Sequence, residues 1–140
     1  MTRIDFYISP DSHPQARLRL ACRLADKAYQ RGHGVFVYAP REEDARRLDD
    51  LLWTFRAGSF VPHARLEEDP EAPVLIASQP PEDGGEVLVS LDEGVPPFFT
   101  RFTRLVELVS GDAAARSAGR ERFRFYRERG YPLYTHDLSP

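Results

Sequence analysis

Short continuous apolar runs recur along the chain, and most of them are separated by longer segments with helical periodicity. Runs of this kind are typical of strands that are buried on both faces of a parallel sheet. Strands are therefore predicted at residues 3–8, 35–39, 74–78, 87–91 and 104–109. Pro10 and Pro40 follow the first two runs and end them.

Apolar residues at steps of three and four predict helices between these strands. One such stripe lies in residues 13–31 and consists of Leu18, Cys22, Ala25 and Tyr29; a second lies in residues 41–53 and consists of Ala45, Leu48 and Leu52. A further helix is predicted over residues 112–129, with Gly130 as its C-cap, and a helical turn over residues 96–103. Residues 67–73 and 79–86 are rich in Pro, Gly and acids and are predicted to be surface loops.

The alternation of strands and helices predicts an α/β fold. We expect a single domain over residues 1–140, with a mostly parallel, doubly wound, Rossmann-like sheet flanked by helices. The later pair of strands could add an antiparallel edge to this sheet. A chain of this length can bury one core without metals or disulfides.

Net charge, cysteine content and the absence of long apolar stretches argue against several classes of protein. The net charge of −3 argues weakly against a domain that grips a DNA backbone by itself, because such domains usually carry a basic face. Cys22 is the single cysteine, so no intramolecular disulfide can form, as in a reducing compartment. No signal peptide follows Met1, and no apolar stretch is long enough to span a bilayer. We therefore expect a cytoplasmic protein without membrane contact.

The sequence offers no nucleotide-binding turn. A dinucleotide site needs a glycine-rich turn directly after the first strand, whereas residues 9–12 (SPDS) contain no glycine. The one G-x-G pattern, at residues 32–34, precedes a strand instead of following one, which is typical of a helix C-cap and turn.

The sequence also lacks the residue patterns of a metal site or a catalytic site. The four histidines are scattered, and no metal-ligand spacing is present. The carboxylate pairs Asp92–Glu93 and Asp49–Asp50 are more typical of a solvated turn and a helix face, and Cys22 lies on an apolar stripe. We therefore expect no enzyme activity, no cofactor and no metal. A small α/β enzyme of unknown chemistry stays open as an alternative.

The last predicted helix concentrates positive charge. Residues 112–131 contain six arginines, at positions 116, 120, 122, 124, 127 and 129, against three acids. Helical periodicity places Arg116, Arg120, Phe123 and Arg127 on one face. Guanidinium groups beside an aromatic ring suit a peptide end, because they can bind its carboxylate while the ring covers an apolar side chain. The alternatives are a solvated basic helix, and a nucleic-acid-binding module in which the same arginines contact phosphates.

A second aromatic group lies near the end of the second predicted helix. Trp53 falls off the apolar stripe of that helix, and Phe55, Phe60 and Val61 follow closely. Trp and Phe are enriched in the cores of protein interfaces. The segment is therefore either a partner-binding surface or a lid that closes the core beside the sheet.

Several short segments, taken in order and at their spacing, resemble the chi subunit family of bacterial DNA polymerase III. They are Phe6-Tyr7, Leu48-Asp49 through Leu52-Trp53, Ser59-Phe60-Val61-Pro62-His63, residues 120–127 (RERFRFYR) and Gly130-Tyr131. The resemblance runs from near Met1 to about Thr135.

This resemblance implies a non-catalytic adaptor in DNA replication. Family members bind the psi subunit of the clamp loader and the acidic C-terminal tail of single-stranded DNA-binding protein, and they contact DNA only indirectly. The tail-binding surface maps onto Arg116, Arg120, Phe123, Arg124 and Arg127, and the psi-facing surface onto Trp53, Phe60 and Val61. Two features depart from the family pattern: Phe123 stands where a tyrosine is expected, and Gly119 should weaken the helix by about 1 kcal/mol relative to alanine.

Overall fold

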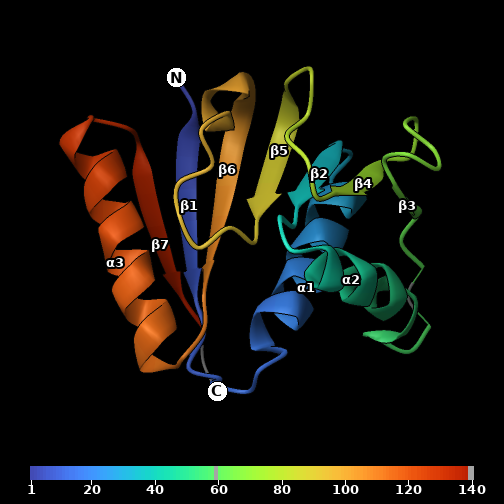
Figure 1. Cartoon of the computed structure of the whole chain (residues 1–140), viewed down its shortest axis with the longest axis horizontal. Coiled ribbons are helices and arrows are strands. Elements are labelled where there is room, and N and C mark those ends of the chain that lie inside the picture. The colour runs from blue at the N-terminus through green and yellow to red at the C-terminus, as the bar shows by residue number, and fades with distance from the viewer. Residues whose placement is uncertain (59, 139–140) are drawn as a thin grey trace.

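The computed structural model describes residues 1–58 and 60–138, which form one sheet with helices on both faces (Figure 1). Ser59, part of the segment 59–63 quoted above, lies outside the described residues. In the described part of the chain the strands are β1 (Arg3–Ile8), β2 (Val35–Tyr38), β3 (His63–Arg65), β4 (Val74–Ala77), β5 (Gly85–Ser90), β6 (Phe102–Val109) and β7 (Leu133–Asp137). The helices are α1 (Ala16–Gln30), α2 (Glu42–Thr54) and α3 (Ala113–Glu128), with a 3-10 turn η1 (Phe99–Arg101).

The strands lie in the order β3-β4-β2-β5-β6-β1-β7, and every pair that the structure describes is parallel. The predicted α/β class and doubly wound sheet are confirmed. The expectation of an antiparallel edge is wrong, since β5 and β6 pair in parallel near the centre of the sheet and both edge strands are parallel as well. The segment 96–103 contains only the short turn η1 before β6 begins at Phe102.

Sequence patterns missed the two edge strands, β3 and β7. An edge strand has one neighbour and is partly solvated, so it needs no continuous apolar run. The residues of β3 are all half-buried, and β7 contains exposed Tyr134 and Asp137. Because both strands are partly polar, hydrophobic periodicity does not predict them.

Each face of the sheet buries its own core. Val37 and Val89 lie in the cluster that α1 and α2 cover, together with the stripe residues of both helices. Ile4 and Phe6 lie on the opposite face, where Tyr126 of α3 and the aromatic residues around η1 cover them. Successive residues of a strand point to opposite faces, so Asp5 points to the α1 side of β1. This places α3 and α1 on different sides of the strand pair β1 and β7.

The helix ends follow the predicted punctuation. Gly32 after α1 and Gly130 after α3 have φ angles of +85° and +76°, a conformation that glycine adopts without steric strain. The chain can therefore leave α3 in a tight turn and enter β7, the last strand, which pairs with β1.

Candidate protein-binding surfaces

One of the six arginines in the last helix is a core residue. Arg122 is 5% exposed. Its Nε donates to Oε1 of Glu107 at 3.1 Å, and its Nη1 and Nη2 donate to the backbone oxygens of Glu93 and Leu108 at 2.8 and 3.2 Å. Because all three nitrogens are engaged, Arg122 fastens α3 to β6 and is not available to a ligand.

Glu107, the partner of Arg122, is fully buried in β6. It also accepts a hydrogen bond from the hydroxyl of Tyr126 at 2.5 Å. Burial raises the pKa of the Glu107 carboxyl, and the Arg122 guanidinium opposes this effect. Burial, and then the charge of Glu107, raises the pKa of Tyr126. The glutamate inside the apolar run 104–109 was the sequence signal for this buried pair, because a carboxylate in a core strand needs a partner.

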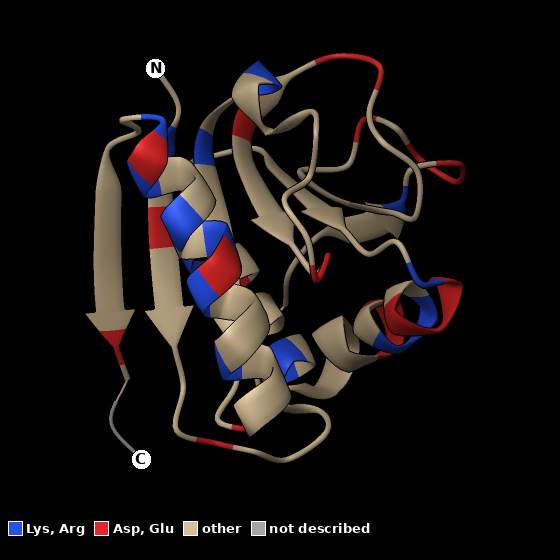
Figure 2. Ribbon diagram, turned by 60° about the vertical axis from the view of Figure 1, so that its left-hand side comes forward, with Lys and Arg blue, Asp and Glu red and all other residues tan. Residues whose placement is uncertain are grey.

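Basic residues follow one another along α3 (Figure 2), as the sequence predicts. Arg116, Arg120 and Arg127 are exposed, and none of them forms an ion pair within the described residues. The Arg127 guanidinium lies 5.9 Å from the centre of the Phe123 ring. Arg124 is exposed too and forms a surface ion pair with Glu121 at 3.2 Å.

Phe123 is only half-exposed, because its ring packs edge-on against Phe6 of β1 at a centroid distance of 5.3 Å. The sequence predicts a surface position among arginines for Phe123. In the structure the ring is partly exposed and lies near Arg127, but its other part is buried. The ring is therefore held rigidly by the core while one part of it stays open to a ligand. Such a ring can receive an apolar side chain without first being ordered.

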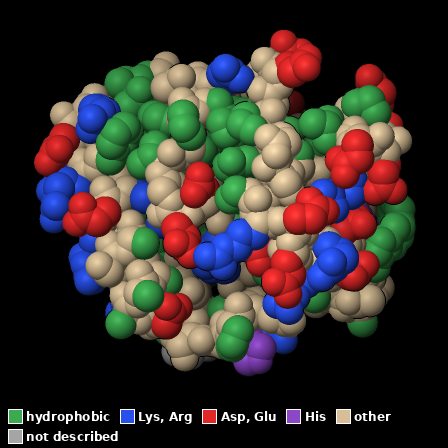
Figure 3. All heavy atoms as spheres, viewed as in Figure 1, with side chains coloured by type: hydrophobic (Ala, Val, Ile, Leu, Met, Phe, Trp, Pro, Cys, Tyr) green, Lys and Arg blue, Asp and Glu red, His purple; other side chains and the backbone are tan. Residues whose placement is uncertain are grey.

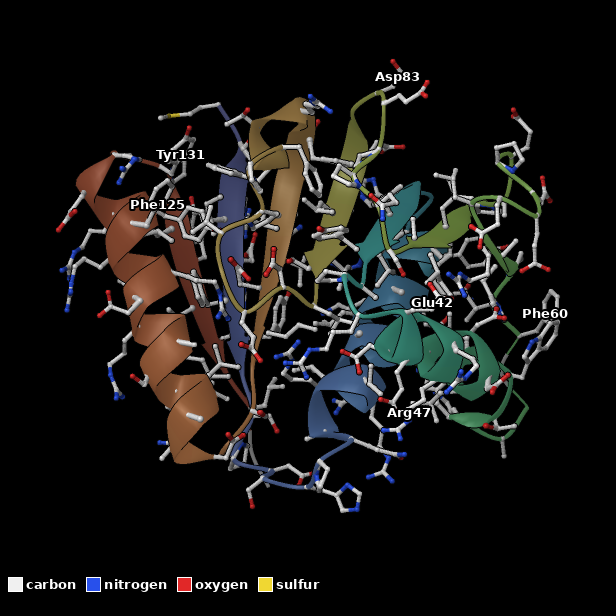
Figure 4. The ribbon with its side chains drawn as sticks, in the orientation of Figure 1. Glu42, Arg47, Phe60, Asp83, Phe125 and Tyr131 are labelled. Atoms are coloured by element: carbon white, nitrogen blue, oxygen red, sulfur yellow. The ribbon has the colours of Figure 1, made fainter. Side chains whose placement is uncertain are left out.

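A second aromatic group lies at the C-terminal end of α3. The Phe99 ring lies edge-on to both Phe125 and Tyr131, at centroid distances of 6.5 Å and 5.1 Å. The Arg129 guanidinium covers Phe125 at 3.6 Å. Figure 4 shows Phe125 and Tyr131 near each other, and Figure 3 shows hydrophobic side chains gathered in this part of the face. Arg129 is thus occupied by an aromatic ring of its own helix.

The aromatic residues after α2 divide into exposed and buried ones. Trp53 and Phe60 are 57% and 62% exposed, and their rings lie 5.8 Å apart (Figure 4). Trp53 also contacts the His63 ring at 4.7 Å. Val61 is 1% exposed and belongs to the core cluster of α1 and α2. Val61 therefore does not lie on this surface, and it fixes the position of its neighbour Phe60 instead.

His63 packs against Trp53, one of the two exposed rings. Its side chain is buried, its Nδ1 lies 2.6 Å from the backbone oxygen of Val61, and its Nε2 lies 3.1 Å from that of Asp49. The His63 ring therefore lies between the backbone of α2 at Asp49 and the backbone at Val61. Trp53 and Phe60 together present an apolar surface to solvent, which is uncommon for such large side chains.

A cavity of about 670 Å³ lies at the carboxyl ends of the strands, where α/β enzymes often bind ligands. Arg17 lines it and donates to the backbone oxygen of Leu91 at 2.5 Å; burial, and then the charge of Arg122, lowers the pKa of Arg17. Glu93 pairs with Arg41 at 3.2 Å, and Asp112 caps the first turn of α3. Arg17, Glu93 and Asp112 therefore make contacts within the protein, which connect loops and stabilise the start of α3.

Within the described residues, no group of three His, Cys, Asp or Glu side chains could hold a metal ion. Cys22 is fully buried, and burial raises the pKa of its thiol to about 12, so it makes a poor nucleophile. None of the described helices is long and apolar enough to cross a membrane.

Comparisons with solved structures show how widely this fold is used. The T4 protein UvsW superposes with a TM-score of 0.69 at 12% identity, over 98% of this chain and 41% of that one. The yeast protein Dbp5, solved with Nup159, Gle1, IP6 and ADP, superposes with a TM-score of 0.65 at 10% identity, over 99% and 42%. The chain spans about two fifths of these larger proteins, and identities this low show the fold alone.

Sequence comparison is more specific. Residues 1–134 match the family model of the DNA polymerase III chi subunit, HolC. The DNA polymerase III subunit chi of Pseudomonas aeruginosa is 46% identical over 99% of this chain and 98% of its own length. The subunit chi of Escherichia coli is 35% identical over 84% and 82%, and that of Haemophilus influenzae is 27% identical over 96% of each chain. The chain therefore belongs to the DNA polymerase III chi subunit family.

Proposed function

We propose that this protein is a non-catalytic adaptor of the replicase clamp loader that binds the C-terminal tail of single-stranded DNA-binding protein and the psi subunit. Membership of the chi family supports an accessory role in DNA replication. The two partners are those that the resemblance to the family implies, and each is assigned to a surface whose exposed residues carry suitable chemistry.

The observation that carries the tail assignment is the exposed arginine row beside the half-buried Phe123 ring. Arg116, Arg120 and Arg127 bring positive charge that no carboxylate of the described chain neutralises. A tail that ends in a free carboxylate next to an apolar aromatic residue complements both features. In this proposal Arg120 anchors the carboxylate, Phe123 receives the apolar side chain, and Arg116, Arg124 and Arg127 attract the acidic residues before it.

The psi subunit is assigned to the Trp53–Phe60 surface. Exposed aromatic pairs of this kind are the usual centres of protein interfaces, because each ring can bury a large area at little entropic cost. The surface lies at the β3 end of the sheet, whereas α3 lies beside β1 and β7 (Figure 1). Both partners could therefore be bound at the same time.

The tail assignment is tested by calorimetric titration with a short acidic peptide that ends in Asp-Phe-Pro-Phe, next to the same peptide with an amidated C-terminus. We expect binding that depends on the free carboxylate. The variant Arg120→Ala should lose about 1.5–3 kcal/mol of binding free energy, the range for hydrogen bonds to charged groups. Arg46→Ala is the matched control, since Arg46 is an exposed arginine of α2.

Equal binding of the free and amidated peptides would contradict a carboxylate anchor. An unchanged affinity in a folded Arg120→Ala variant would remove Arg120 from the site. If neither peptide binds, the tail assignment fails while the family membership and the fold stand.

A further inference from the structure

A groove runs between α1 and the side of β1 and β7 that faces away from α3. In the parallel register, Asp5 pairs with Tyr134 and Tyr7 with His136, so these four side chains share one side of the sheet. Helix α1 packs mainly on β2, β5 and β6, further from the β7 edge (Figure 1). A cavity of about 420 Å³ lies between the helix and Tyr7 and Leu138.

The helical wall of this groove is a row of cations. Arg23, Lys27 and Arg31 follow each other at steps of four residues and line the cavity together. All three are exposed, and none forms an ion pair within the described residues. Four residues of helix rise by about 6 Å, so the three charges form a line with that spacing.

The strand wall adds further positive charge around a single carboxylate. Asp5 is fully buried and accepts hydrogen bonds from Arg3 at 3.0 Å, Arg104 at 2.8 Å and His136 at 2.9 Å. Two arginines thus share one aspartate, and their guanidinium groups stay partly open to solvent. Arg104 also lines a small cavity together with Lys27 and Arg31, which joins the two walls.

The charge of the groove is opposite to that of the whole chain. Its described cations are Arg3, Arg23, Lys27, Arg31, Arg56 and Arg104. Three carboxylates lie among them: Asp5 pairs with Arg3 and Arg104, Asp26 pairs with Arg56 at 2.9 Å, and Glu86, at one end, pairs with His33 at 2.8 Å. Six cations therefore face three carboxylates. In a protein with a net charge of −3, this is a local positive surface on a face that α3 does not share. Such a surface attracts polyanions.

Flat side chains lie beside the cations. Tyr134 is 47% exposed, and the Arg3 guanidinium covers its ring at 4.0 Å. His136 stacks on Tyr7 with a centroid distance of 4.3 Å and an interplanar angle of 11°. A cationic row next to an exposed planar ring such as Tyr134 is the combination that binds single-stranded nucleic acids, with phosphates on the cations and a base on the ring.

Two observations favour a single strand over other anionic partners. Tyr134, which is 47% exposed, offers a planar surface to an unpaired base, whereas the bases of a duplex are already stacked on one another. The apolar floor offers little to an amphipathic acidic peptide, because Tyr7 and Leu20 are only 8% and 4% exposed. We propose that the groove between α1 and the β1–β7 strand pair binds single-stranded nucleic acid, with Arg23, Lys27 and Arg31 on the phosphates and Tyr134 on a base.

The proposal is independent of the tail and psi assignments and adds a direct contact to the indirect one expected from the family. It is tested by fluorescence anisotropy of the full chain with a labelled oligothymidylate of about 16 nucleotides, the upper site size of single-strand-binding folds. The titration is repeated over a series of salt concentrations. We expect binding at low salt that weakens linearly in a plot of log affinity against log salt.

The groove variant is Arg23→Ala, Lys27→Ala and Arg31→Ala combined, and the matched control is Arg41→Ala, Arg46→Ala and Arg47→Ala combined. Both sets remove three exposed cations, so the overall charge changes equally. The groove variant should bind at least about tenfold more weakly, with the salt slope reduced by about 2, and the control should bind as the parent does. Tyr134→Ala should weaken binding several-fold without changing the salt slope, whereas Tyr134→Phe should not.

Four outcomes would overturn the proposal: no binding at low salt, equal losses in the two triple variants, duplex binding as tight as single-strand binding, or equal competition by polyglutamate. The last outcome would make the groove an acidic-peptide site instead. Circular dichroism of each variant separates a lost contact from a lost fold, and retained binding of the tail peptide by the groove variant shows that α3 is intact.

Discussion

Gly119 of α3 lies so close to Val109 of β6 that a Cβ atom at position 119 would stand 2.8 Å from Cγ2 of the valine. Real Cβ atoms essentially never approach so closely, and the branched valine has little freedom to move away. The glycine weakens the helix locally, as its sequence position suggested, but it is what lets α3 reach the sheet. The same approach brings Arg122 to Glu107.

Gly119→Ala should therefore destabilise the protein. The gain in helix propensity is about 1 kcal/mol, whereas overpacking costs about 1–3 kcal/mol. We expect a net loss in the free energy of unfolding, measured by urea denaturation. In the double variant with Val109→Ala, the two changes should compensate in part, because the clashing methyl groups are gone. A stabilised Gly119→Ala variant would show that the helix packs further from β6.

Arg122 and Arg124 should respond differently to substitution, although they are two residues apart. Arg122→Met leaves the buried Glu107 without its cation, and loss of one partner of a buried ion pair costs about 3–5 kcal/mol. Arg124→Ala removes only a surface pair with Glu121, which contributes about 0–1 kcal/mol. Thermal and urea unfolding of the two variants measures both effects. Equal stabilities would mean that Arg122 is solvated rather than buried.

Asp5 should make the protein sensitive to acid. Burial alone would raise the pKa of Asp5, but hydrogen bonds from Arg3, His136 and Arg104 outweigh it and lower the pKa below its ordinary value of 3.8. A depressed pKa in the folded state means that the charged carboxylate stabilises the fold above about pH 4, and that this contribution is lost as the pH falls further.

The comparison of Asp5→Asn with the parent over pH measures this contribution. The variant should lose about 1.5–3 kcal/mol of unfolding free energy at neutral pH, and the difference should narrow as the parent is acidified. Asp137→Asn, at an exposed carboxylate of β7, serves as the control. A difference between Asp5→Asn and the parent that is independent of pH would assign the loss to packing rather than to charge.

Trp53 is the single tryptophan of the chain, so its fluorescence reports on one surface. Because the side chain is 57% exposed, its emission should be close to that of indole in water, and acrylamide should quench it efficiently. A partner that covers the Trp53–Phe60 surface should shift the emission to the blue and reduce quenching. A shielded indole in the isolated chain would place Trp53 in the core.

Cys22 provides a measure of global unfolding. Its thiol is buried on the inner face of α1, and burial raises the pKa of the thiol to about 12. A disulfide reagent should therefore react with it only through unfolding, at a rate that rises with denaturant. Fast reaction in native buffer would indicate local opening of α1.

The sequence by itself determined the central strands, the three helices and the chemistry of the last helix. Strands buried on both faces must be apolar throughout, and helices on a sheet must carry an apolar stripe, so local periodicity reports both. The arginine row on α3 was visible for the same reason, since Arg116, Arg120 and Arg127 share a face of one helix.

Tertiary structure alone decided what depends on residues far apart in the chain. It placed the edge strands β3 and β7, buried Arg122 against the sheet, and showed that Val61 lies in the core and not on the surface that Phe60 forms. Asp5 is hydrogen-bonded to the side chains of residues 3, 104 and 136, and the α1 groove exists because β7 returns beside β1. Local periodicity carries no information about which partner lies across a sheet, and the energy of a charged side chain depends on that partner.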